Sequence, residues 1–529
     1  MAFSKILPEL LGEILQYFRQ DYRILYSCIL VNRLWCNSAI PLLWENPFSF
    51  MRPKNLHFIE IYLYDLNDDE KTKLIEYGMD KNLFPSNTLF KYSSFIKHLD
   101  IYKISKSIED WDRTLATKNF RKSNFTKLIC RSLIQLFIEN VANLHSLHVL
   151  YGSFDDIFEL ILQNSNFIGN IKNLQLSHLE MSVSIIKFLT FLSSNCNSIS
   201  SLLYQCYNHY EHQQMMGNGL SQIIKSQKNL RKILFRSPLY QSLLSLKNSN
   251  CSNTLNTIIF YYIEFKNIII LNEVFNQLNV LESIHIIHCS YLDTKFVQQI
   301  ININKPFKLK SLFLREVSQF EPLDLLLQHF GCYLENFESR VDSKPQLLQL
   351  FKSVTKYCRK IKSLYLHLLW DYRNINLVFN LIENIKQSLN YLSIDLCFVT
   401  DMKNDFHSII LQNLGQILPF KLEYLNLCLA INENDLEIFL KNSQNTFIKE
   451  LSIKNESHDL YVTIYPCIKE YIMKKKKVKY LTISDKFNVS WFSSKDIEEF
   501  RLYDIQILKY SYMRNFDVLY KGDLSMLLW

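Results

Sequence analysis

A recurring pattern of apolar positions constrains the fold of this chain more than any other feature of its sequence. In each copy an apolar residue is followed by two variable positions, a second apolar residue, one variable position and a third apolar residue. Fourteen copies occur, with Ser339 in the third place of one, and they begin at Ile96, Leu144, Ile171, Ile199, Leu230, Leu255, Leu281, Leu309, Leu334, Ile361, Leu389, Leu422, Ile448 and Val478. From Leu144 the copies recur at intervals of 25 to 33 residues, which predicts a repeated structural unit.

Each repeat is expected to contain one strand and one helix. The second and third apolar positions are two residues apart, so they share one face of a β-strand. Residues 294–301 then carry Phe296, Val297 and Ile300 at helical spacing. Because strand and helix alternate, we expect an α/β solenoid with a parallel β-sheet on its concave side and helices on its convex side.

The first 47 residues differ from the repeats and predict three short amphipathic helices. Pro8 is expected in the first turn of the first helix, Asp21 is expected to cap the second, and Pro41 to limit the third. The apolar stripe of the first helix consists of Leu7, Leu10, Leu11, Ile14, Leu15 and Phe18. Three such helices make a small core, so they need a partner.

This N-terminal segment resembles the F-box. The residues that carry the resemblance are Leu7, Pro8, Ile14, Leu15, Phe18, Leu25, Val31 and Trp35. Position 32, often Cys or Ser in the family, is Asn32 here. The resemblance implies that these eight residues dock on the Skp-type adaptor of a cullin-RING ubiquitin ligase. The alternative is that the helices only cap the first hydrophobic layer of the repeats.

The repeats resemble leucine-rich repeats, whose period is about 20 to 29 residues. The best match is residues 281–294, which are similar to the cysteine-containing class common in F-box proteins. The resemblance places Cys289 at the buried corner after the strand, and Cys397 stands at the same offset from Leu389. The other units lack a cysteine at this corner.

The patterns divide the chain into four parts. Residues 1–47 are the F-box-like helices, 48–95 a helical bridge, 96–489 the leucine-rich-repeat solenoid and 490–529 a C-terminal cap. In the bridge, residues 56–66 and 68–77 have helical spacing and Gly78 can end the second helix. The long interval between Ile96 and Leu144 holds a polar stretch and an apolar helix at residues 128–141.

No enzyme motif or cofactor site occurs in the sequence. The 529 residues are 48% hydrophobic and 21% charged but contain only 9 glycines, which excludes a glycine-rich phosphate loop. The histidine pairs at 145 and 148 and at 285 and 288 lie on expected strands, where this spacing sends the rings to opposite faces. His209 and His212 lack further metal ligands nearby. We therefore assign no catalytic residue, cofactor or metal.

The net charge and the cysteine content indicate which kinds of partner and which cellular compartment to expect. A net charge of +8 over this length does not predict nucleic-acid binding. The densest basic run, Lys474 to Lys477, has two interpretations, a solvated turn before a strand and a nuclear-localisation signal, and the turn is favoured. The 12 cysteines form no disulfide framework, and no apolar stretch reaches transmembrane length. We expect reduced thiols, no membrane partner and a cytoplasmic and/or nuclear location.

The concave face of the repeats is the expected target-binding surface. Side chains between and beside the core positions of each strand point to this face. Those chosen from the later repeats are Phe313, Arg315, Tyr365, His367, Tyr391, Asp395, Tyr424 and Asn426. Aromatic residues and arginine often anchor protein interfaces, so the expected ligand is a protein.

These observations give two hypotheses for function. In the first, the chain is the non-catalytic substrate-recognition subunit of a Skp/cullin/F-box-type E3 ubiquitin ligase, and its solenoid binds a target protein. In the second, it is a leucine-rich-repeat scaffold without a ligase role. Binding to a purified Skp-type adaptor distinguishes the two.

Overall fold

The computed structural model describes residues 3–19, 21–49, 56–84, 88–115, 124–140, 143–150, 155–177, 183–205, 213–236, 240–247, 249–305, 307–314, 319–340, 344–367, 375–396, 405–455, 465–473, 478–485 and 492–508. The chain forms two compact units. The first contains residues 1–233 and 239–255, and the second contains residues 234–238 and 256–529.

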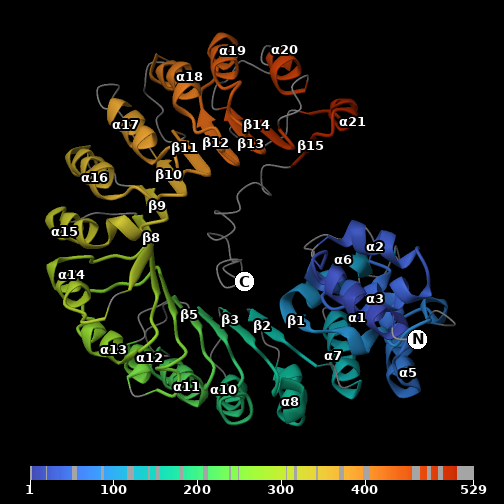
Figure 1. Ribbon diagram of the computed structural model, residues 1–529. Coiled ribbons are helices and arrows are strands. Elements are labelled where there is room, and N and C mark those ends of the chain that lie inside the picture. Colours follow the sequence, from blue (N-terminus) through green and yellow to red (C-terminus); the bar gives the residue numbers. More distant parts are fainter. Residues whose placement is uncertain are drawn as a thin grey trace. The chain divides into compact units, whose positions relative to one another are not determined.

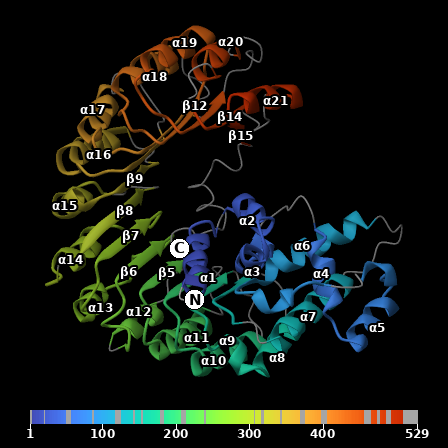
Figure 2. The same ribbon diagram turned by 45° about the vertical axis from the view of Figure 1, so that its right-hand side comes forward.

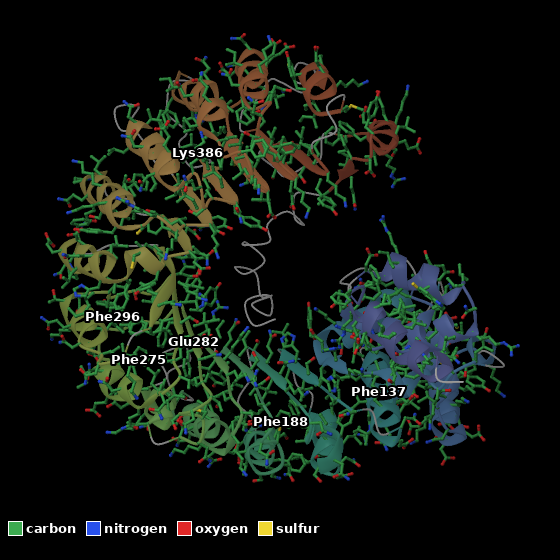
Figure 3. The ribbon with its side chains drawn as sticks, viewed as in Figure 1. Phe137, Phe188, Phe275, Glu282, Phe296 and Lys386 are labelled. Atoms are coloured by element: carbon green, nitrogen blue, oxygen red, sulfur yellow. The ribbon has the colours of Figure 1, made fainter. Side chains whose placement is uncertain are left out.

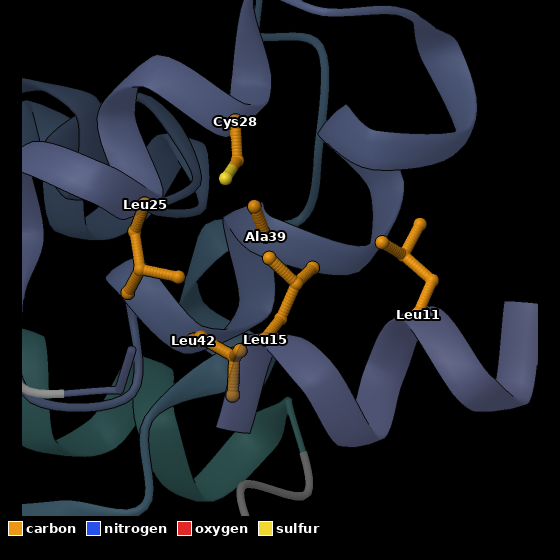
Figure 4. Packing of buried hydrophobic residues seen from close by; sticks show 6 residues of the cluster. All are labelled: Leu11, Leu15, Leu25, Cys28, Ala39 and Leu42. Carbon is orange, nitrogen blue, oxygen red and sulfur yellow. The ribbon is translucent and has the colours of Figure 1, made fainter. Parts of the chain in front are cut away.

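The first unit begins with three helices, α1 (Phe3–Gln16), α2 (Tyr22–Ile29) and α3 (Arg33–Leu43). Helices α1 and α2 both pack on α3. Their small shared core consists of Leu11, Leu15, Leu25, Cys28, Ala39 and Leu42 (Figure 4). Phe18, Leu34 and Trp35 pack against its edge and stay partly exposed. Three helices are therefore present where the sequence predicts them.

The cap predicted for α2 is confirmed, and α3 is capped as well, but both proline predictions are wrong. Asp21 Oδ1 accepts hydrogen bonds from the backbone of Arg23 and Ile24, and Asn32 Oδ1 accepts one from Trp35 at 3.0 Å. Helix α1 starts at Phe3, so Pro8 lies inside it, and α3 continues past Pro41. A proline removes only one backbone donor, and packing on the shared core offsets that loss in such short helices.

The predicted bridge contains the two expected helices, α4 (Phe58–Tyr64) and α5 (Asp68–Glu76). Short 3-10 turns accompany them at η1 (Pro47–Ser49), η2 (Lys81–Leu83) and η3 (Tyr92–Phe95). Gly78 follows α5 with φ of +93°, the left-handed conformation that favours glycine. The bridge packs on its neighbours through rings, since Tyr62 lies 5.2 Å from both Trp44 and Phe137 between ring centroids.

Strands and helices alternate through the rest of the first unit. The elements are β1 (His98–Asp100), α6 (Ile101–Thr114), α7 (Asn124–Glu139), β2 (Ser146–Leu150), α8 (Asp155–Leu162), α9 (Ser165–Ile168), β3 (Asn173–Ser177), α10 (Val183–Asn195), β4 (Ser201–Gln205), α11 (Gln213–Ser226), β5 (Lys232–Arg236) and α12 (Tyr240–Leu246). Strand β1 is short, because Asp100 caps α6 and the third apolar position, Ile101, begins that helix. The division between the units falls within β5.

The second unit continues the alternation. The elements are β6 (Thr257–Tyr261), α13 (Leu271–Gln277), β7 (Ser283–Ile287), α14 (Thr294–Ile301), β8 (Lys308–Leu314), α15 (Glu321–Phe330), η5 (Gly331–Tyr333), β9 (Asn336–Ser339), α16 (Lys344–Tyr357), β10 (Ser363–His367), α17 (Ile375–Ile385), β11 (Tyr391–Asp395), α18 (Asp405–Ile417), β12 (Tyr424–Leu429), α19 (Glu433–Asn442), β13 (Glu450–Asn455), α20 (Tyr465–Ile468), η7 (Lys469–Met473), β14 (Tyr480–Asp485), α21 (Ser494–Leu502) and β15 (Gln506–Ile507).

The strands of each unit pair in chain order, and every described pair is parallel. The pairs run from β1 to β4 in the first unit and from β6 to β15 in the second. In the second unit the helices α13 to α19 cover one side of the sheet (Figures 1 and 2). We call the opposite side of this sheet the strand face. The α/β class with a parallel sheet is therefore confirmed.

The apolar positions of all fourteen copies are buried, as the sequence predicts. In the copy that starts at Leu281, for example, Ile284 and Ile286 are both buried in the core. Aromatic residues of the helices fill the space behind the strands, as with Phe275 of α13 and Phe296 of α14 (Figure 3). Each repeat thus stacks its strand and its helix on those of the neighbouring repeats.

Three details differ from the predicted repeat or refine it. Ile286 pairs with Leu312, whereas equivalent positions of the two copies would pair it with Leu314, and the register between β7 and β8 also shifts after Ile284. A fifteenth strand, β15, lies inside the predicted C-terminal cap. Cys289 is buried after β7, as the resemblance implies, and burial raises the pKa of its thiol to about 12.

Several predictions lie outside the described residues. They concern Arg315, Cys397, His209, His212, the lysine run at 474–477 and the tail from residue 509, together with the side chain of Leu7. Nine described cysteines are free, but Cys428 is disulfide-bonded, so the expectation of reduced thiols is wrong for that residue. None of the helices in the described ranges has the length and apolar character that a membrane crossing requires.

Candidate partner-binding surfaces

The residues predicted to bind an adaptor divide between the core of the three helices and their surface. Leu15 and Leu25 are fully buried, while Phe18 and Trp35 are partly buried against the same core. Ile14 and Val31 remain 51% and 57% exposed, and Pro8 is half-buried. The structure therefore leaves only part of the predicted set available to a partner.

Further apolar residues of these helices are exposed, and the sequence reading did not assign them to the surface. Leu10 and Ile14 are four residues apart on α1 and are both about half exposed, and Tyr17 follows one turn later. Leu30, next to Val31, is 72% exposed. The sequence reading placed Leu10 on the core stripe, because a helix with too many apolar positions does not reveal which of them face inward.

A surface hollow lies on α2 beside this exposed segment. It is lined by Arg23, Ile24, Ser27 and Val31, together with the buried Cys28. Most of its lining is therefore aliphatic or small, with one guanidinium at the rim. Such a hollow can receive one apolar side chain of a partner.

A buried carboxylate ties the three helices to the first strand of the repeats. Glu45, just after α3, is buried, and it accepts hydrogen bonds from Arg19, one of them from Nη2 at 3.0 Å. Its backbone oxygen accepts hydrogen bonds from the amides of Lys97 and His98, and Lys97 Nζ lies 3.7 Å from the carboxylate.

The position of His98 strengthens this connection. Arg19 Nη2 lies 3.2 Å from His98 Nε2, and His98 Nδ1 lies 2.7 Å from Ser146 Oγ on β2. Burial, together with the nearby positive charge of Arg19, lowers the pKa of His98 to about 4. The ring is therefore neutral near pH 7, so it can accept a hydrogen bond from the guanidinium.

Two of the residues predicted for target binding are not exposed. Phe313 on β8 is 2% exposed and Tyr365 on β10 is 7% exposed. Their ring centroids lie 5.9 Å apart, and Phe313 also packs on His288. Expecting them at the surface was wrong, because the two residues lie on either side of Glu338 of β9 in register, and large side chains packed on one face of a sheet bury each other.

The strand face holds an ionic group around Glu338 of β9, which is almost fully buried. Its carboxylate accepts a hydrogen bond from Arg340 Nε at 2.8 Å and lies 3.2 Å from His367 Nε2. Asp395 Oδ2 on β11 lies 3.4 Å from the other ring nitrogen of His367. Two of the predicted residues, His367 and Asp395, are therefore close together, while Glu338 was not predicted.

The pKa shifts in this group follow from burial and from the opposite charges. Burial alone would raise the pKa of Glu338, but the contact with His367 and the charges of His288, His367 and Arg340 lower it to about 2. Burial alone would lower the pKa of His367, but its contacts with Asp395 and Glu338 outweigh burial and raise it. The group therefore favours a charged histidine between two carboxylates.

A second row of side chains lies at the beginning of strands β11 to β14. Tyr391, Tyr424, Glu450 and Tyr480 occupy equivalent positions and pair in register. Tyr391 is exposed and the other three are partly exposed. The prediction named the first two tyrosines but missed Glu450 and Tyr480, which stand directly before the second apolar position of their copies, as the two tyrosines do. Asn426, also predicted, donates a hydrogen bond to Ser393 Oγ at 3.0 Å.

The histidine pairs considered in the sequence do not act together. His148 contacts Asp100 at 2.7 Å, while His285 contacts Ser311 at 2.8 Å. Across the part of the chain that the structure describes, no three His, Cys, Asp or Glu side chains gather in a way that could hold a metal ion.

Compared with the models of known protein families and with curated proteins, the chain matches none.

Proposed function

We propose that this chain is the substrate-recognition subunit of a Skp/cullin/F-box-type E3 ubiquitin ligase. Its N-terminal helices bind the Skp-type adaptor, and through it the cullin-RING ligase, while its repeats bind a target protein. The chain itself performs no reaction, needs no cofactor and acts in the cytoplasm and/or the nucleus.

One observation carries this proposal. The three-helix segment exposes large aliphatic side chains, above all Ile14 on α1 and Leu30 and Val31 after α2. Their apolar surface stays in contact with water unless another molecule covers it, so three large exposed aliphatic residues on so small a segment favour a binding partner. Ile14 and Val31 also belong to the set that resembles the F-box.

The scaffold hypothesis explains a different part of the same segment. Glu45, just after α3, accepts backbone hydrogen bonds from Lys97 and His98 at the beginning of β1, and this contact supports a capping role. A cap explains apolar residues that face the repeats, but Ile14 and Val31 are exposed within the unit. The ligase hypothesis accounts for both features, since the same helices can cap the sheet and bind an adaptor.

The test compares adaptor binding by the parent chain and by the double variant Leu10→Ser/Ile14→Ser. Both residues are about half exposed, so we expect the melting temperature of the variant to stay close to that of the parent. Loss of an interface anchor costs about 2 kcal/mol or more, which is roughly a thirtyfold loss of affinity. Calorimetric titration with a purified Skp-type adaptor measures this difference.

The matched control is Ile269→Ser, which makes the same change at an exposed isoleucine of the second unit. This control should bind the adaptor as the parent does. If the parent does not bind the adaptor, or if the double variant binds as tightly as the parent, the scaffold hypothesis replaces the ligase proposal.

A further inference from the structure

The row at the beginning of strands β12 to β14 places a carboxylate between two tyrosines. Tyr424 of β12 pairs in register with Glu450 of β13, and Glu450 pairs with Tyr480 of β14. The next residues along these strands, Leu425, Leu451 and Leu481, are buried in the core. Because side chains alternate along a strand, the two tyrosines and the glutamate share the strand face.

Glu450 is a partly buried carboxylate on the strand face. Among the described residues it forms no ion pair and no side-chain hydrogen bond. Burial raises its pKa, and the charge of Lys449 offsets only part of this effect. Water screens a partly buried carboxylate less than an exposed one, so a cation placed over Glu450 gains more than it would at an exposed carboxylate.

The neighbouring rings suit a flat cation. Adjacent strands lie about 4.8 Å apart, so Tyr424 and Tyr480 stand roughly 10 Å apart on either side of Glu450. That spacing leaves room for one planar group between the two rings. Tyr391 extends the aromatic wall, with its ring centroid 5.9 Å from that of Tyr424. The ring of Tyr480 already attracts a cation, since Lys479 Nζ lies 5.5 Å from its centroid.

The next residue of β13 on the strand face is buried. Ser452 stands two residues beyond Glu450 on β13 and therefore on the same face. Its side chain is fully buried, and its hydroxyl has no hydrogen-bond partner among the described residues. The accessible part of the strand face at this point therefore consists of Glu450 and the tyrosines on either side of it.

We propose that Glu450, Tyr424 and Tyr480 form a binding site for an arginine side chain of a protein partner. A guanidinium stacks on aromatic rings and pairs with a carboxylate through two parallel hydrogen bonds, which an ammonium group cannot do. This inference rests on the proposed function in one respect, since it names the chemistry of the target. The site itself does not require the adaptor.

The test uses saturation-transfer NMR with the full chain, which detects weak ligands of a large protein. The probe is Nα-acetyl-arginine methylamide, and the uncharged comparison is the citrulline derivative of the same shape. We expect saturation transfer to the arginine methylene groups, and binding about tenfold weaker for citrulline, because both the ion pair and the cation–π contact are lost.

Variants locate the binding. Glu450→Gln should weaken arginine binding about tenfold, and Tyr480→Leu should weaken it as well, while each variant keeps the parent's melting temperature. Glu282→Gln makes the same charge change at an exposed residue of the same unit and should bind as the parent does. If Glu450→Gln fails to fold, Tyr480→Leu carries the test alone.

Three outcomes would overturn the proposal. They are equal binding of the citrulline derivative, unchanged binding by Glu450→Gln, and equally tight binding of the lysine derivative. Adaptor binding is measured separately in the same variants, so a failure of this site and a failure of the ligase proposal remain distinguishable.

Discussion

Nε2 of His367 on β10 lies 3.2 Å from Oε1 of Glu338 on the neighbouring strand β9. The contact joins a nearly fully buried carboxylate to a histidine that also faces Asp395. A charged histidine stabilises both carboxylates, so the stability of the second unit should depend on pH.

The first prediction concerns this pH dependence. The pKa of His367 is raised above its ordinary value of 6.5 on folding, so its contribution is fully present below 6.5 and is lost as pH rises through the raised value. The pKa of Glu338 is lowered from 4.5 to about 2, so its contribution is present above 4.5 and is lost as pH falls toward 2. The contributions of His367 and Glu338 to the free energy of unfolding are therefore both fully present between pH 4.5 and 6.5.

Thermal melts of the parent chain and of His367→Gln at pH 5.5 and pH 8.5 measure this effect. Arg340 and His288 also face Glu338, and they are present in both chains, so the difference between the chains isolates His367. The parent should lose more stability than the variant on going to pH 8.5. An identical loss in both chains would show that His367 does not carry the charge.

The second prediction concerns the stacking of the repeats. Ile284 on β7 is fully buried, and replacing it with aspartate places an unpaired charge in the core, at a cost of several kcal/mol. Because each repeat packs on its neighbours, Ile284→Asp should unfold more than its own copy, which limited proteolysis followed by mass spectrometry can map.

The matched control for this change is Glu282→Ala, two residues earlier and exposed (Figure 3). Its melting temperature should stay close to that of the parent, with a change in free energy of unfolding within about 0.5 kcal/mol. Equal melting of Ile284→Asp and Glu282→Ala would refute the assignment of Ile284 to the repeat core.

The third prediction concerns the connection between the N-terminal helices and β1. Glu45→Gln removes the charge that Arg19 and Lys97 face. We expect the free energy of unfolding to fall by about 2 kcal/mol, less than for a fully buried pair because Arg19 is partly exposed. Urea denaturation followed by tryptophan fluorescence measures the change, since Trp44 and Trp35 lie in this region.

The control for this variant is Glu9→Gln, an exposed glutamate on α1. It should leave the urea midpoint unchanged. A midpoint for Glu45→Gln equal to that of Glu9→Gln would show that the carboxylate adds nothing to the connection.

The local elements of this protein and their order follow from the amino-acid sequence alone. A strand whose residues alternate between core and surface repeats its pattern every two residues, so fourteen strands could be located from apolar spacing alone. The helix Thr294–Ile301 has the bounds that its spacing predicts. The side chain of Asp21 caps α2 as expected, because a cap depends only on residues next to each other.

Which of these residues a partner can reach, and which of them act together, depends on how the elements pack in three dimensions. Glu338 and His367 are 29 positions apart in the chain, and Glu450 and Tyr480 are 30 apart, so their contacts depend on strand register. Phe313 and Tyr365 bury each other, whereas Leu10 is exposed although it shares the apolar stripe of α1. Local spacing fixes the face of an element on which a side chain lies, but burial depends on what packs against that face.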